Sequence, residues 1–77
     1  SAFSWSPDGR SLTFIMDNSV VLCDVASGVV SRLTEKTVSP PLPDAVVFSP
    51  DGQHIAYMRE VDDFTQIFVT ETEGELM

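Results

Sequence analysis

Apolar and β-branched residues gather in short runs that are separated by glycine, proline, aspartate and serine. Such runs between turn residues are typical of β-strands. They predict strands at 2–5, 10–16, 19–25 and 29–34, and further strands ending near Phe48 and spanning 53–59 and 65–72. No segment gives a convincing helix, so the pattern predicts an all-β, antiparallel fold.

The alternation within these runs is broken, so that neither face of the predicted sheet is purely polar. Phe14 and Ile15 point to opposite faces of one strand, as do Val20 and Val21 in the next. An antiparallel sheet with one wet face alternates more strictly. We therefore expect another sheet stacked on each side.

One four-residue sequence, SPDG, occurs twice, and Ser49 lies 43 residues after Ser6. Proline suits the first central position of a type I turn, aspartate the second, and glycine the left-handed position that follows. The predicted turn residues are Ser6, Pro7, Asp8, Gly9, Ser49, Pro50, Asp51 and Gly52. An aromatic residue precedes each copy, and apolar residues follow, which indicates an internal repeat.

The repeat divides the chain into three segments. Residues 1–34 form a complete four-stranded unit, 35–45 a proline-rich connection, and 46–77 a second unit whose fourth strand would begin after Met77. Val20 aligns with Ile67, an offset of 47 residues, so the second unit contains four more residues than the first before this strand. We assign those extra residues to a polar loop, Glu60 to Phe64.

Composition excludes several classes of function. With 12 acidic and 4 basic side chains the net charge is −8, and the basic residues are scattered, which argues against nucleic-acid binding. No run of 18 apolar residues predicts a membrane span. One cysteine and one histidine provide neither an internal disulfide nor a Cys/His metal site.

The stretches FSWSPDGRSLTFI … VVLCDVASGVVSRLT and VVFSPDGQHIAYM … QIFVTETEGE resemble the WD-repeat-like blades of TolB-type β-propellers. They also resemble blades in the N-terminal propellers of prolyl-oligopeptidase-type serine peptidases, including the dipeptidyl-peptidase IV group. The resemblance implies about two four-stranded propeller blades, a partial propeller, with no cofactor. It leaves the location as bacterial periplasm or cytoplasm.

Two functions follow from the resemblance. In the first, the segment belongs to the non-catalytic propeller that covers the active site of a serine peptidase and filters peptide substrates. In the alternative, it belongs to a TolB-like scaffold that holds a protein partner and has no enzymatic activity. No Gly-x-Ser-x-Gly motif occurs, so this segment is itself not expected to be an enzyme.

The partners expected in either case are neighbouring blades of the same chain or other copies. A third possibility is that the 77 residues are the working unit. Its exposed edges and apolar faces would then be buried by stacking or strand exchange between copies. The isolated chain is expected to associate.

Candidate reactive residues have structural explanations. Ser6 and Ser49 are predicted to cap turns, since neither has a histidine at a spacing that suits a catalytic triad. His54 is predicted to be a half-exposed strand residue. Cys23 is predicted to be a buried, inert thiol. We identify no catalytic, cofactor or metal residue.

Two further features keep two interpretations each, and a third is a candidate for contact with substrate. Glu60, Asp62 and Asp63 form either a solvated loop or a weak cation site. Ser39 to Pro43 is either a rigid connection or a polyproline ligand. Arg59 and Glu60, predicted at a strand end, are the candidates for lining a propeller channel and meeting substrate.

Overall fold

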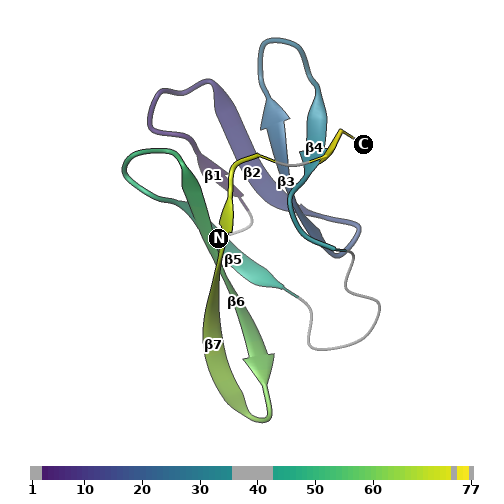
Figure 1. The fold of residues 1–77 in the computed structure, drawn as a ribbon, viewed down its shortest axis with the longest axis vertical. Helices are drawn as coiled ribbons and strands as arrows, with labels where there is room; N and C mark the ends of the chain where they lie inside the picture. The colour runs from purple at the N-terminus through teal and green to yellow at the C-terminus, as the bar shows by residue number, and fades with distance from the viewer. Residues whose placement is uncertain (1–2, 36–42, 74, 77) are drawn as a thin grey trace.

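The computed structural model describes residues 3–35, 43–73 and 75–76, which form eight β-strands and no helix (Figure 1). The strands are β1 (Phe3–Trp5), β2 (Ser11–Met16), β3 (Ser19–Asp24), β4 (Val30–Arg32), β5 (Asp44–Phe48), β6 (His54–Val61), β7 (Phe64–Glu71) and β8 (Glu75–Leu76). The predicted all-β, antiparallel fold is confirmed. In these residues nothing forms a helix long and apolar enough to cross a membrane.

The strands form two antiparallel sheets, one for each repeat. The first has the order β1-β2-β3-β4-β8 and the second the order β5-β6-β7. Strand β8 leaves the second repeat and pairs with the edge of the first sheet, where Arg32 lies opposite Glu75. This strand was not predicted.

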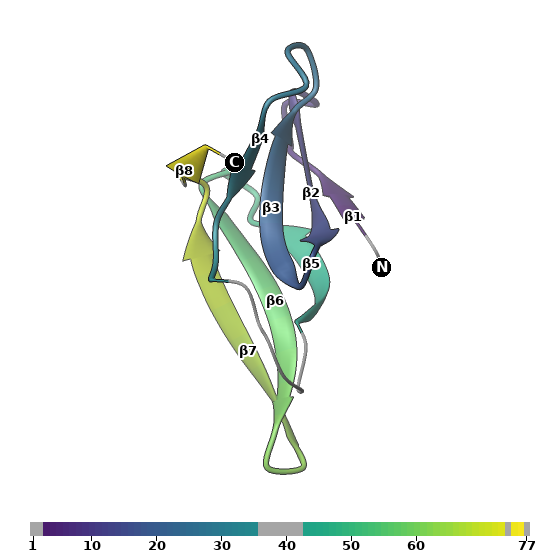
Figure 2. The ribbon, with the colours of Figure 1, turned by 90° about the vertical axis from the view of Figure 1, so that its right-hand side faces the viewer.

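The two sheets stack through one face each (Figure 2), and the core lies between them. Its fully enclosed members are Val20 from the first sheet and Val46 and Ile55 from the second. The partly buried residues around them are Ile15, Leu22, Leu33, Phe48 and Tyr57. Removing these apolar side chains from water supplies the main force that holds the sheets together. We expected a further sheet stacked on each side of a sheet. Among the described residues, each sheet is covered by another on one side only.

The connection from β6 to β7 differs from the predicted loop. Strand β6 runs to Val61 and β7 starts at Phe64, so only Asp62 and Asp63 form the turn, both with positive φ (51° and 67°). The β2–β3 turn is built in the same way from two residues with positive φ. Both are the mirror-image turns that match the twist of a hairpin. The four extra residues lengthen each strand from six to eight residues.

The second repeat begins earlier than the predicted boundary at residue 46. Strand β5 already includes Asp44 and Ala45, and its pairing with β6 shifts between Asp44 and Val47. Ala45 has φ +54°, so this irregularity is a β-bulge that re-aims the strand. The proposed polyproline segment lies outside the described residues apart from Pro43, which is buried.

Candidate functional site

Each SPDG turn is closed by a serine and an aspartate two residues apart. The Ser6 hydroxyl donates to Asp8 Oδ1 (2.7 Å) and accepts from the Ser11 backbone N–H (2.9 Å). Asp8 Oδ1 also accepts from the Arg10 N–H (2.9 Å). The Gly9 N–H closes the turn on the Ser6 carbonyl (3.0 Å), and Gly9 takes the predicted left-handed conformation, with φ +73°.

The second turn repeats this network. Ser49 Oγ donates to Asp51 Oδ1 (2.6 Å), which accepts from the Gln53 N–H (2.9 Å). Ser49 Oγ in turn accepts from the His54 backbone N–H (3.1 Å). The predicted role of the repeated residues as turn formers is therefore seen in both copies.

The hydrogen bonds lower the pKa of both turn carboxyl groups. The Ser6 hydroxyl is the main cause for Asp8, followed by the Arg10 N–H. For Asp51 the main cause of the lowered pKa is the Ser49 hydroxyl, followed by the Gln53 N–H. Both groups stabilise the charged form of the carboxylate.

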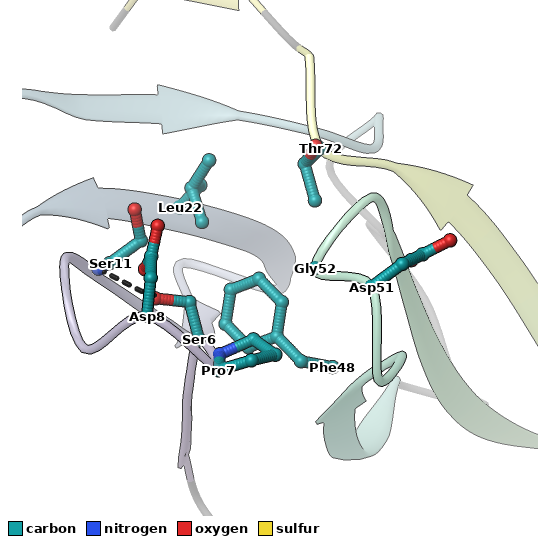
Figure 3. Close-up of a pocket in the computed structure, with 9 residues that line it drawn as sticks. All are labelled: Ser6, Pro7, Asp8, Ser11, Leu22, Phe48, Asp51, Gly52 and Thr72. Carbon is teal, nitrogen blue, oxygen red and sulfur yellow. Dashed lines mark hydrogen bonds between the residues drawn. The ribbon is translucent and has the colours of Figure 1, made fainter.

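The two turns lie next to each other, one from each sheet. A Cβ built on Gly52 would stand 3.4 Å from Pro7 Cδ, so the two turns approach each other closely at this glycine. Beside this contact lies an open cavity of about 200 Å³ (Figure 3). Its wall includes Asp8 and Asp51 together with the apolar side chains of Leu22 and Phe48.

The chemistry at this cavity does not support catalysis. Ser6 Oγ and Asp8 Oδ1 are both engaged by the hydrogen bonds described above. Ser49 contacts the backbone N–H of His54 and not its imidazole ring. Figure 3 shows the Asp51 side chain pointing away from Asp8, so the two carboxylates do not converge on one point. The cavity is a junction between two structural turns.

The remaining candidates are dispersed over the second repeat and β3. His54 is exposed at the start of β6, and Cys23 is half-buried, so the prediction of a buried thiol is only partly right. Arg59 lies inside β6 and not at its end, with its guanidinium 5.7 Å from the centre of the Phe68 ring. Glu60 points to the opposite face, so these two residues are not brought together.

The acidic residues near the hairpin tip are divided between a strand and a turn. Glu60 lies in a strand, whereas Asp62 and Asp63 form the turn. Across the described parts of the chain, no three His, Cys, Asp or Glu side chains are placed to hold a metal ion.

Exposed apolar side chains form two surfaces on the outside of the stacked sheets. We call the outer side of the first sheet the aromatic face; Phe3, Trp5 and Met16 on it are 52%, 53% and 37% exposed. We call the outer side of the second sheet the aliphatic face. It consists of Val47, Ala56, Met58, Ile67 and Val69.

The aliphatic face is also open to solvent. Val47, Ile67 and Val69 are 53%, 70% and 63% exposed. Contiguous apolar surface of this kind marks a site of interaction more often than a random surface does. The broken alternation predicted apolar residues on both faces, but it did not indicate which two faces would meet.

Comparison with known proteins gives one informative match. The chain is 45% identical over 73 residues to the uncharacterized protein YidR of Escherichia coli (strain K12), and the aligned residues make up 95% of this chain. The match spans 17% of that relative's length. No protein-family model matches the chain, and no solved structure matches it.

Proposed function

We propose that this chain provides two adjacent blades of a β-propeller whose role is to bind a partner and not to catalyse a reaction. The observation that carries the proposal is that the succession of the first three strands in one sheet recurs in the other, and that the two sheets stack face to face through apolar surfaces. Repeated antiparallel sheets packed in this way are the building principle of propellers. The hydrogen-bonded turn serines and aspartates favour a structural role for the repeated motif.

Two kinds of parent protein fit this proposal. In a prolyl-oligopeptidase-type peptidase, the blades would help to gate the entry of peptides to a separate hydrolase domain, with Arg59 and Glu60 as candidate channel residues. In a TolB-like scaffold, the blades would hold a protein partner.

The length of the relative favours the scaffold. Since 73 residues are 17% of it, that protein has roughly 430 residues. With about 43 residues per repeat, a propeller of six to eight blades would occupy most of this length. Less than half of the length would then remain for a hydrolase domain.

Active-site labelling of the complete polypeptide that carries these residues tests whether it is a serine peptidase or a scaffold. A fluorophosphonate probe modifies the activated serine of a serine peptidase and leaves turn serines unmodified. We expect no labelling above that of a heat-denatured control. Stoichiometric labelling of one serine outside this segment would overturn the scaffold and support the peptidase.

A further inference from the structure

The β6–β7 hairpin projects beyond the first sheet. Figures 1 and 2 both show its tip extending past the other strands that are drawn. Its strands have eight residues each, against six in β2 and β3, and the last pair before the turn is Val61 opposite Phe64. Among the described residues, the strands of the first sheet therefore end short of this pair.

Phe64 lies on the face of the hairpin that is turned toward the first sheet. Side chains alternate along a strand, so Val61 shares one face of β6 with Ile55 and Tyr57, which pack in the core. Phe64 is directly opposite Val61 and so belongs to the same face. In the proposed propeller, a following repeat would cover the other face of this sheet and would leave Phe64 open.

The ring of Phe64 is freely accessible. At 72% exposed, it is the most exposed large apolar side chain among the described residues. Burying a phenylalanine ring is strongly favourable, and aromatic side chains are enriched at the centres of protein interfaces. The position and exposure of Phe64 therefore suit an anchor for another molecule.

The part of the hairpin next to the tip provides an ordered support for this ring. The rings of Tyr57 and Phe68 stack across the two strands with their centres 5.6 Å apart. The Arg59 guanidinium lies 5.7 Å from the centre of the Phe68 ring. Cross-strand contacts of this kind stabilise a hairpin, and a surface that is already ordered loses less entropy when it binds.

The charges at the tip define what kind of partner fits. Asp62 and Asp63 form the exposed turn, and Glu60 is exposed opposite Thr65. Arg59 is the only lysine or arginine between residues 54 and 71. Carboxylates around an apolar anchor favour lysine and arginine on the partner and repel nucleic acid.

We propose that the tip of the β6–β7 hairpin, with Phe64 as its anchor, docks on a partner polypeptide that presents apolar side chains beside lysine or arginine. The apolar side chains would cover the Phe64 ring, and the basic ones would meet Asp62 and Asp63. This docking surface lies at the end of β6 opposite the second SPDG turn. The proposal rests on the scaffold function above and specifies its surface and the chemistry of its partner.

The experiment uses the complete polypeptide that carries these residues. The probe is a short fluorescent peptide in which lysine alternates with leucine, and fluorescence anisotropy measures its binding. Two comparison peptides have glutamate in place of lysine or serine in place of leucine. Phosphatidylcholine vesicles test whether the exposed ring inserts into a membrane instead.

Four variants separate the ring from the charges. Phe64→Ser removes the ring, whereas Phe64→Leu keeps an apolar side chain. Asp62→Asn/Asp63→Asn removes both turn charges, and asparagine tolerates the positive φ of this turn. Val29→Ser is the matched control, because Val29 is 46% exposed and lies in the β3–β4 connection, away from the hairpin. Circular dichroism checks the fold of each variant.

We expect the lysine–leucine peptide to bind and both comparison peptides to bind more weakly. Phe64→Ser should raise the Kd about tenfold, as loss of an interface anchor does. Phe64→Leu should restore most of the affinity, and Val29→Ser should leave it unchanged. The double asparagine variant should raise the Kd and reduce its dependence on salt, since two charge pairs are lost.

Three results would overturn the proposal. They are a lysine–leucine peptide that does not bind, equal binding by folded Phe64→Ser, and binding to the vesicles in place of the peptide. The serine-labelling experiment can fail separately, because it reports on a residue outside this segment. Labelling with Phe64-dependent peptide binding would overturn the scaffold and keep the docking surface, and the reverse pattern would keep the scaffold alone.

Discussion

At each SPDG turn, one serine and one aspartate satisfy backbone groups that the tight reversal leaves without partners. Their hydrogen bonds differ by no more than 0.2 Å between the two copies. In the first copy the Ser11 N–H is part-buried, and a buried backbone N–H group is costly to leave unpaired. The motif is therefore repeated because the same reversal is needed at the start of each hairpin.

Acid should weaken the fold through these turns. The pKa values of Asp8 and Asp51 are lowered in the folded chain, so their charged forms add stability above the unfolded pKa of about 3.9, and this contribution is lost as the pH falls through the lower folded values. Urea unfolding at a series of pH values should show the free energy of unfolding falling below about pH 4.

The double variant Asp8→Asn/Asp51→Asn should reduce this slope, and Asp8→Asn alone should reduce it less. An unchanged slope in the double variant would show that these carboxylates do not control the acid response.

Two buried hydroxyls of the first sheet provide a matched comparison. Thr13 Oγ1 donates to the Val21 carbonyl (2.8 Å), whereas Ser19 Oγ, in the described part of the chain, is buried without a hydrogen-bond partner. We expect Ser19→Ala to raise the free energy of unfolding by about 1 kcal/mol and Thr13→Val to lower it by about 1 kcal/mol. Denaturant titration distinguishes them, and equal losses in both variants would contradict this assignment.

The turn chemistry at this scale could be predicted from the sequence, and the bulge at Ala45 could not. Proline, aspartate and glycine restrict their own backbone angles, so the local sequence carries the information. Alanine has no such preference for positive φ, and its angle of +54° is set by the surrounding sheet.

Among the elements, the β6–β7 hairpin shows how an insertion of four residues is accommodated. Directly opposite residues in an antiparallel pair alternate between hydrogen-bonded and non-hydrogen-bonded positions. A hairpin that keeps the same two-residue turn can therefore be lengthened only by two opposed pairs at a time. The added pairs are Glu60 opposite Thr65 and Val61 opposite Phe64.

Deletions in this hairpin test the pairing rule. Removing all four added residues should leave a folded chain, because Arg59 and Gln66 then flank the turn in the correct hydrogen-bonding phase. Removing only Val61 and Phe64 should destabilise the chain more, although fewer residues are lost. Thermal unfolding followed by circular dichroism measures both, and a more stable two-residue deletion would refute the rule.

The position of this insertion was predicted correctly, but its structure was not. Counting residues between aligned strands locates the extra four, and their polar character suggested a loop. Whether such residues extend a hairpin or widen its turn depends on cross-strand pairing, which the local composition does not encode. Strand β8 was missed for a related reason, since its partner β4 is far away in the sequence.

In the molecule as a whole, the stacked sheets leave apolar surface outside and carry a net charge of −8. The fold class followed from strand patterns, whereas the choice of which faces meet did not. That choice depends on the shapes of two surfaces from different repeats. The sequence shows only that each strand has apolar residues on both sides.

Assembly of the chain should strengthen with salt. Copies that each carry a charge of −8 repel one another, and the screening length falls from about 30 Å at 0.01 M to about 8 Å at 0.15 M ionic strength. We expect the average mass from light scattering to rise over this range at constant protein concentration. A mass that falls with added salt would mean that ion pairs, and not apolar contact, hold the copies together.

The paired insertion in the β6–β7 hairpin also limits the lengths that this hairpin can adopt. Each permitted step adds two residues per strand, which is about 7 Å of strand length. The distance by which a hairpin projects from its repeat can thus change in increments of that size without disturbing the register below it. Related chains that keep the two-residue turn should differ in hairpin length by multiples of four residues, with intermediate lengths requiring a different turn.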